Sequence, residues 1–271
     1  MTEPSAWVGR TERASDRIDP WPAAALAAAL GQDDPPGLGE ALPPYWHHLY
    51  ARLPVPAAAT GPDGHWQRGI FQPPAEGRRM WAGGRVTWHH PLVVGEPVER
   101  LSTVKAVSAK QGRSGPLVFV ATEHRYGNGS GAAVIEEQDI VYRAGAATGA
   151  PQAAPPGAAW RREWQADPVL LFRYSALTFN GHRIHYDQAY ARGVEGYADL
   201  VVHGPLLATL LLDLVRRERP QAMVRRFDFR AVAPVLVDRP FAVCGVPHVD
   251  GARLWVEEGG ELRMTAGVAF G

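Results

Sequence analysis

The sequence predicts an α+β protein made of two similar units, each a helix followed by antiparallel strands. An Ala- and Leu-rich stretch at 19–30 precedes alternating segments that run to residue 142, and the same order recurs after a stretch of Ala, Gly and Pro at 144–159. Helices followed by runs of strands that short turns connect are typical of α+β units. We therefore expect two domains, 1–150 and 151–271, joined by that stretch, which has the composition of a linker.

The first unit is expected to begin with a helix over 19–30. Asp19 suits the N-cap, Pro20 the first helical position and Gly31 the end. Proline and glycine punctuate the region that follows, which favours loop with one or two helical turns at 45–53. Residues 1–15 are interpreted as a polar lead-in. Strands are predicted at 85–89, 98–109, 116–126 and 132–142.

The second unit contains the longest aliphatic run of the chain. Residues 205–217 predict a helix that is apolar on most faces and therefore buried, and Pro220 stops it. An apolar segment at 169–178 precedes it, and a short helix is expected at 187–191. Strands are predicted at 222–232, 240–246, 253–256 and 262–270. The two units thus resemble structural repeats with little sequence identity.

Composition excludes several classes of function. Lys plus Arg and Asp plus Glu both number 28, so no global positive field indicates a nucleic-acid partner. Cys244 is the single cysteine, which rules out an intramolecular disulfide and argues against a cysteine-based zinc site. The N-terminus has no signal-peptide pattern, and no apolar run is long enough for a membrane span. We expect a cytoplasmic protein.

Polar and apolar residues meet in the stretch from Tyr174 to Leu214. The first part contains Asn180, His182 and His185, a composition typical of an active-site loop. The second part begins with His203-Gly204-Pro205 and continues as the aliphatic helix.

These residues resemble the MaoC-like (R)-specific enoyl-CoA hydratase family. Its signature is an Asp, then an Asn-Pro two residues on, then a His five residues after the Asp, with His-Gly and an apolar helix downstream. Here His185 matches the histidine, Asn180 stands at the aspartate position, and His182-Arg183 replaces Asn-Pro. The downstream element matches as Val202–Leu206. The sequence of residues 179–187 resembles more closely a subgroup of the family with two fused hot-dog domains. That subgroup includes mesaconyl-C4-CoA hydratases, itaconyl-CoA hydratases and type 2 hydroxyacyl-thioester dehydratases.

The resemblance implies a fold and an activity. Each domain would be a hot dog, a long helix wrapped by a curved antiparallel sheet. The reaction would be reversible syn addition of water to a trans-2-enoyl thioester, without a cofactor or metal. The implied partner is an acyl-CoA substrate, and a fused chain that already mimics the usual dimer could pair further as a homodimer.

The resemblance also implies roles for three residues. Hydration needs a base for water and a donor for the enolate oxygen. His185 would be the base and acid, Asn180 would orient the water because an amide cannot take up its proton, and the Gly204 amide would hold the oxyanion at the helix N-terminus. On residues alone, Asn180 could equally cap a short helix, His185 could be a buried structural histidine, and Gly204 could be a tight helix entrance.

Arg183, His203 and Tyr186 are expected to contact the substrate. Arg183 could pair with a substrate carboxylate, although an ion-paired surface arginine explains it as well, and His203 and Tyr186 could serve only the loop structure. The N-terminal half has no Asn/Asp-to-His pair at the family's spacing, so we expect it to be catalytically silent. Its aromatics would form either core alone or core and part of the acyl pocket: Trp46, Trp66, Trp81 and Trp88.

Three functions follow from these expectations. The first is hydration of a short branched dicarboxylic acyl-CoA, such as mesaconyl-C4-CoA to citramalyl-CoA. The second is dehydration of 3-hydroxyacyl thioesters of fatty-acid type, and the third is a non-catalytic module that binds acyl thioesters. A carboxylate needs a cation in the acyl pocket, whereas a long chain needs an apolar tunnel.

Overall fold

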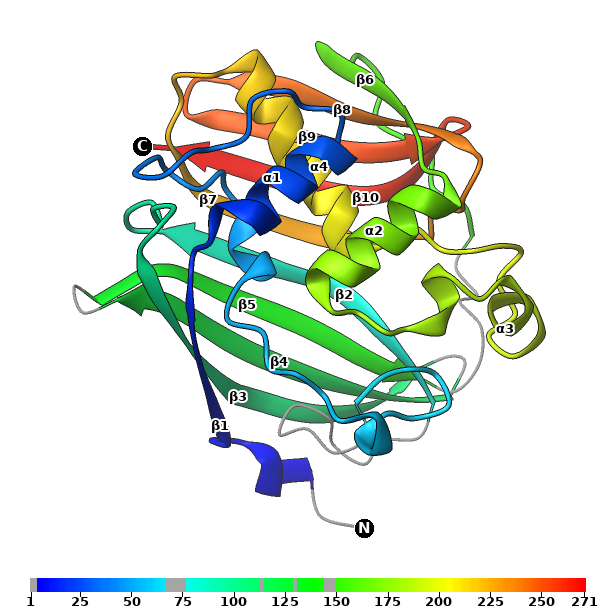
Figure 1. The fold of residues 1–271 in the computed structure, drawn as a ribbon. Coiled ribbons are helices and arrows are strands. Elements are labelled where there is room, and N and C mark those ends of the chain that lie inside the picture. The colour runs from blue at the N-terminus through cyan, green and yellow to red at the C-terminus, as the bar shows by residue number, and fades with distance from the viewer. Residues whose placement is uncertain (1–3, 67–76, 113–114, 129–130, 144–149) are drawn as a thin grey trace.

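Ten antiparallel strands form one continuous sheet in a computed structural model that describes residues 4–66, 77–112, 115–128, 131–143 and 150–271 (Figure 1). The strand order is β1-β3-β4-β5-β2-β7-β10-β9-β8-β6, so each half of the chain supplies five neighbouring strands. The halves meet where β2 pairs with β7, in a register that runs from Gly83 opposite Arg230 to Thr87 opposite Arg226. The boundary expected near residue 150 therefore falls within a chain whose two halves share a sheet.

The N-terminal strands are longer than predicted and include one that the sequence analysis missed. They are β1 (Thr11–Arg17), β2 (Arg78–Trp88), β3 (Pro97–Gly112), β4 (Gly115–Asn128) and β5 (Gly131–Arg143). The described part of the polar lead-in contains η1 (Pro4–Trp7) and runs into edge strand β1, which pairs with β3. Only Ala14 of its residues is buried, so no apolar alternation marked it as a strand.

The C-terminal strands also include an unpredicted edge strand. They are β6 (Trp160–Gln165), β7 (Val224–Ala231), β8 (Pro240–His248), β9 (Gly251–Glu258) and β10 (Glu261–Phe270). Strand β6 pairs with β8. Part of the expected linker packs against this half, since the Leu262 amide donates to the Gln152 carbonyl over 2.8 Å; residues 144–149 lie outside the described residues.

Four α-helices and four short 3-10 helices complete the described chain. They are α1 (Pro20–Ala29), α2 (Pro168–Thr178), α3 (Gln188–Gly193), α4 (Gly204–Glu218), η1 (Pro4–Trp7), η2 (Trp46–Leu49), η3 (Ala57–Ala59) and η4 (Arg183–His185). Asp19 caps α1 as predicted, since its side chain accepts from the Trp21 amide at 2.9 Å. The apolar segment before the motif is helix α2, with Asp167 as its cap. Within the described part of the chain, no helix is long and apolar enough to cross a membrane.

The two halves differ in what covers the sheet. Helix α4 packs against β6, β8 and β9, and its residues 206–215 are all buried, as the aliphatic run predicted. Helix α1 lies beside α2 near the middle of the sheet (Figure 1). The strands β3, β4 and β5 instead face a cavity that α2 and the segment from Arg52 to Trp66 enclose. This asymmetry places a cavity between the halves.

Candidate active site

The loop after α2 holds Asn180 in a defined turn. Phe179 ends the helix in the left-handed region with φ 51°, and the Asn180 amide donates to the Ser175 carbonyl over 2.8 Å. The Asn180 Oδ1 atom accepts from the His182 amide at 3.1 Å, which closes an Asx turn. The side-chain oxygen therefore serves the loop, and the Nδ2 group is left to meet a water or substrate.

His185 is buried in η4, and one of its ring nitrogens is engaged in a hydrogen bond. Its Nδ1–H donates to the Val201 carbonyl over 2.7 Å, which leaves Nε2 with the free lone pair of a base. Its ring stacks on His203 with centroids 3.6 Å apart and an interplanar angle of 18°. Burial, with the added effect of His203 and His182, holds the pKa of His185 well below its usual range. The imidazole is therefore neutral at pH 7.

His203 connects His185 to the cavity wall. Its Nε2 lies 2.8 Å from the Ser175 Oγ atom, and Ser175 lines the cavity. Its Nδ1 is buried and has no hydrogen-bond partner among the described residues. Burial lowers the pKa of His203 to about 3, so this ring is neutral as well. His203 thus lies behind Ser175, with no place of its own in the cavity wall.

Gly204 occupies the first position of α4, directly before Pro205. The first amides of a helix have no acceptor within the helix, so this end can hold negative charge. A Cβ at Gly204 would lie 2.4 Å from the Trp81 ring, which itself stacks on Phe229 at 4.7 Å. Glycine is required here because Trp81 packs on it, a reason that the sequence analysis did not foresee.

Arg183 and Tyr186 are both tied to the loop. The Arg183 guanidinium binds Asp187 at 2.7 Å and the Pro62 carbonyl at 2.9 Å, and it is not part of the cavity wall. Of the two explanations that the sequence left open for Arg183, the structure shows the ion-paired arginine. Tyr186 is 49% exposed, donates to the Gly181 carbonyl at 2.9 Å and does line the cavity.

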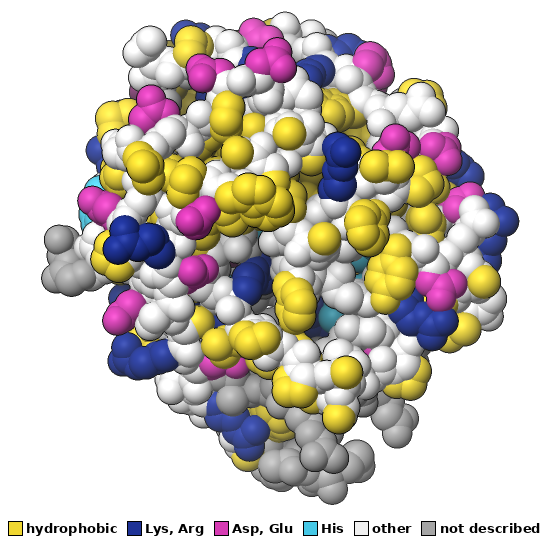
Figure 2. All heavy atoms as spheres, viewed as in Figure 1, with side chains coloured by type: hydrophobic (Ala, Val, Ile, Leu, Met, Phe, Trp, Pro, Cys, Tyr) yellow, Lys and Arg dark blue, Asp and Glu magenta, His cyan; other side chains and the backbone are white. Residues whose placement is uncertain are grey.

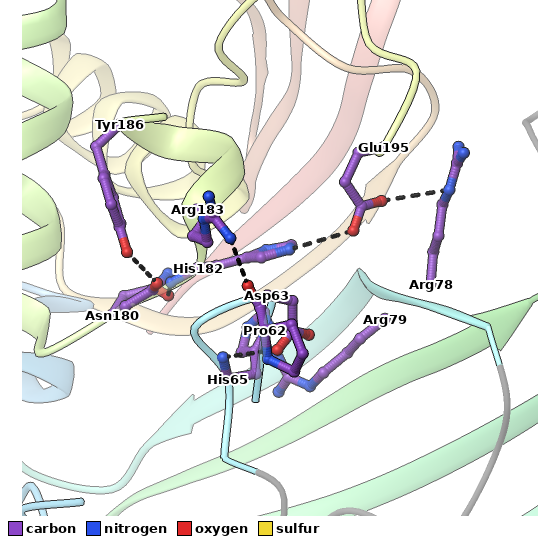
Figure 3. A network of polar contacts seen from close by, with 11 residues as sticks. Pro62, Asp63, His65, Arg78, Arg79, Asn180, His182, Arg183, Tyr186 and Glu195 are labelled. Carbon is purple, nitrogen blue, oxygen red and sulfur yellow. Dashed lines mark hydrogen bonds and ion pairs between the residues drawn. The ribbon is translucent and has the colours of Figure 1, made fainter. Parts of the chain in front are cut away.

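A polar network joins the N-terminal half to this loop (Figure 3). The rings of His65 and His182 lie 4.0 Å apart, and His65 Nδ1 lies 3.3 Å from an Asp63 carboxylate oxygen. On its other side, His182 lies 3.9 Å from Glu195, which pairs with Arg78 at 3.3 Å. No sequence pattern marks this network, because its members come from both halves of the chain.

Asp63, His65 and His182 could in principle hold a metal, since their ligand atoms lie within 4.8 Å of one another. The pKa of His65 is lowered to about 3 by burial and that of Asp63 to about 2, chiefly by hydrogen bonds from His65. However, the Arg79 guanidinium donates to His65 Nε2 at 3.1 Å and places a positive charge against the cluster. The arrangement therefore favours a polar tie between the two loops over a cation site.

The two loops also touch backbone to backbone. Gly64 has φ 84°, and a Cβ there would lie 1.8 Å from the Gly181 carbonyl oxygen. The Arg183 amide donates to the Asp63 carbonyl at 2.9 Å. Positive φ and this contact both require glycine at residue 64.

A cavity of about 510 Å³ lies between this loop and the N-terminal strands. Asn180, Ser175 and Gly181 belong to its wall, whereas His185 and Gly204 lie outside it. Exposed aromatic side chains of Phe172 and Phe179 belong to its lining. Figure 2 shows the same face, with basic and histidine side chains visible in a recess between hydrophobic ones.

Behind the sheet side of the cavity lies a buried polar network. Gln138 of the wall donates to Glu136 at 2.8 Å, and His47 Nε2 lies 3.1 Å from the other carboxylate oxygen. Hydrogen bonds from His47 hold the pKa of Glu136 at about 2 despite complete burial. Of the four tryptophans expected in core or pocket, Trp66 lines the cavity, Trp46 and Trp88 are buried, and Trp81 covers Gly204.

The chain has the fold of two fused hot-dog domains, and its family model and a 44% identical relative place it in the hydro-lyase class of enzymes. A Mycobacterium tuberculosis structure described as a double hot-dog fold aligns with 97% of this chain and 96% of its own chain, with 15% identity and a TM-score of 0.56. The structure of a MaoC-like dehydratase from Phytophthora capsici aligns with 97% of this chain and 96% of its own chain, with 14% identity and a TM-score of 0.70.

The sequence comparisons define the family. The model of hydroxyacyl-thioester dehydratase type 2 matches residues 45–237, and the chain belongs to this family. A mesaconyl-C(4)-CoA hydratase from Chloroflexus aurantiacus is 44% identical over 269 residues, which cover 96% of this chain and 94% of that protein.

Proposed function

We propose that this enzyme adds water reversibly to a 2-enoyl-CoA that carries a free carboxylate, with mesaconyl-C4-CoA to citramalyl-CoA as the reaction. The observation that carries the proposal is the bond from His185 to the Val201 carbonyl, because it leaves a neutral imidazole with a free Nε2. The 44% identical relative supports the same reaction, since its name states this activity.

His185 acts as the base in the proposed mechanism. Its Nε2 takes a proton from water while the water oxygen bonds to the β-carbon, and the electron pair of the double bond moves onto the thioester carbonyl oxygen. The Gly204 amide donates to that oxygen at the N-terminus of α4. The protonated His185 then returns its proton to the α-carbon, so one residue serves as base and acid.

Asn180 orients the attacking water through its Nδ2 group, because its Oδ1 is held by the His182 amide. His185 lies outside the cavity wall, and His203 and Ser175 connect the two. Catalytic contacts often tighten only when substrate binds. Gly204 also lies outside this wall. Substrate binding therefore has to open the wall beside Ser175 to the imidazole and to the Gly204 amide.

The cavity favours a short, polar acyl group over a fatty chain. Its sheet side presents polar side chains at positions where an apolar tunnel would need aliphatic ones: Arg79, Arg100, Thr122, His124 and Gln138. Dehydration of 3-hydroxyacyl thioesters is the alternative that the family description supports. A long apolar chain against these groups would remove them from water, which costs free energy that an apolar lining would not.

The N-terminal half supplies substrate binding in this proposal, and the catalytic groups come from the C-terminal half. The domain boundary at 150, a homodimer of such chains and a cytoplasmic location stay predictions.

Loss of enoyl absorbance tests the proposal directly. Purified protein is mixed with mesaconyl-C4-CoA, itaconyl-CoA and crotonyl-CoA, and mesaconyl-C4-CoA is expected to be hydrated with the highest kcat/KM. His185→Ala should lose roughly 10²–10⁴-fold in kcat with an unchanged circular dichroism spectrum. A parent protein that turns over none of the three, or a His185→Ala variant as active as the parent, contradicts the proposal.

A further inference from the structure

The geometry points to Arg52 as the residue that binds the free carboxylate of the acyl group and so selects a dicarboxylic substrate. This inference rests on the proposed function and names the selecting residue within it. Arg183, the arginine that the sequence suggested for this task, is engaged by Asp187 outside the cavity wall.

The charge of the cavity wall is the first argument. Arg52, Arg79 and Arg100 line the cavity, and Glu12 is the carboxylate among its described lining residues. Burial lowers the pKa of His65 to about 3 and that of His124 to about 4, so these rings add no positive charge at pH 7. The cavity therefore has an excess of positive charge, which favours an anionic ligand.

The partners of the three arginines separate their roles. Arg79 donates to His65 at 3.1 Å, and Arg100 pairs with Glu12 at 2.9 Å. Arg52 makes no ion pair with any described residue, and its Nε donates to the His48 carbonyl at 2.5 Å. That bond orients the guanidinium and leaves both terminal nitrogens for a ligand, which is the fork that binds a carboxylate with two hydrogen bonds.

The backbone before Arg52 is held in a costly conformation. Ala51 has φ 53°, in the left-handed region that non-glycine residues rarely adopt. The Asp16 carboxylate accepts from the Ala51 amide at 2.9 Å and keeps the turn in place. Strain of this kind persists where surrounding contacts over-determine a conformation, often at ligand sites. Here it turns Arg52 into the cavity wall.

The chemistry of the substrate matches a cation at this place. In mesaconyl-C4-CoA the free carboxylate is attached to the carbon that receives the hydroxyl group, so it must lie near the water-orienting Asn180. Arg52 and Asn180 line the same cavity. Glu136 does not compete for Arg52 from this wall, because it is fully buried and bonded by His47 and Gln138.

Turnover by Arg52→Gln tests the assignment. We expect kcat/KM for mesaconyl-C4-CoA to fall about 100-fold, the loss of one charge-assisted bidentate contact. Turnover of crotonyl-CoA, which has no carboxylate, should stay within about 3-fold of the parent. Arg226→Gln is the matched control, because Arg226 is an exposed arginine that pairs with Asp228 outside the cavity.

Competitive inhibition separates binding from chemistry. The probes are 2-methylsuccinyl-C4-CoA and isovaleryl-CoA, saturated thioesters that differ by a carboxylate in place of a methyl group. The parent should bind the first more tightly, and Arg52→Gln should abolish that preference. Equal losses with mesaconyl-C4-CoA and crotonyl-CoA, or a preference that survives in Arg52→Gln, overturn the role of Arg52 but not hydration. A parent that hydrates neither substrate overturns the proposed function itself.

Discussion

The imidazole of His185 is held by the backbone of Val201, whose carbonyl oxygen accepts the Nδ1–H at 2.7 Å. Two backbone bonds hold that carbonyl: the Val201 amide donates to Ile184 at 3.0 Å, and the Val202 amide donates to Val235 at 2.9 Å. The segment before α4 therefore sets the tautomer of His185 without a carboxylate partner. In the proposed mechanism, this relationship lets one histidine serve as the base.

The pH dependence of turnover follows from the environment of His185. Burial lowers its pKa well below the usual value of about 6.5, so the base form persists as the pH falls through that value. With crotonyl-CoA, which has no titrating carboxylate, we expect kcat/KM to stay level from pH 8 to about 6. An acidic limb centred near 6.5 in a protein that remains folded would contradict this prediction.

Asn180→Asp restores the carboxylate that the MaoC-like signature has at this position. Crotonyl-CoA turnover should remain within about 10-fold of the parent, because an aspartate can still accept from the His182 amide. Turnover of mesaconyl-C4-CoA should fall on the order of 10-fold further, since two carboxylates would then lie close together. Asn180→Ala is the control, and it should impair both substrates to a similar extent. Equal effects of Asn180→Asp on both would argue against a carboxylate near Asn180.

Gly204→Ala tests the packing of Trp81 on the start of α4. The added Cβ would lie 2.4 Å from the ring, so we expect a loss of about 1–3 kcal/mol in the free energy of unfolding, measured with urea. Trp81→Leu in the same chain should recover part of that loss by removing the overlap. If Gly204→Ala is as stable as the parent, the ring does not occupy this place.

Stability should fall on acidification because several buried histidines cannot take up a proton in the folded state. Burial lowers the pKa of His48 and of His203 to about 3, whereas in the unfolded chain it is about 6.5. Below pH 6.5 the unfolded state binds more protons, so the free energy of unfolding decreases as the pH falls towards 3.

Urea unfolding between pH 7.5 and 5 measures this effect. Each such histidine adds a slope that approaches about 1.4 kcal/mol per pH unit below its unfolded pKa. His48→Phe should reduce the slope, although it also costs about 1–3 kcal/mol at pH 7.5 because the Tyr174 hydroxyl loses its partner at 2.8 Å. An unchanged slope in His48→Phe would show that His48 does protonate in the folded protein.

Local pattern predicted most of the elements. Helix α4 was evident because its aliphatic residues are consecutive, and the long strands were evident because their side chains alternate. The edge strands β1 and β6 were missed because few of their residues are buried, so they lack that alternation. The helix α2 was predicted only as an apolar segment, although Asp167-Pro168 is a cap and first-position pair.

By itself, the sequence determined the two-unit α+β plan, the buried helix and the motif that carries Asn180, His185 and Gly204, because these depend on residues close together in the chain. Only the tertiary structure decided what surrounds that motif. Asp63 and His65 meet the loop, Trp81 covers Gly204, and Arg52 faces the cavity in place of Arg183. These contacts join residues more than a hundred positions apart, and sheet pairing and burial set such distances, not local periodicity.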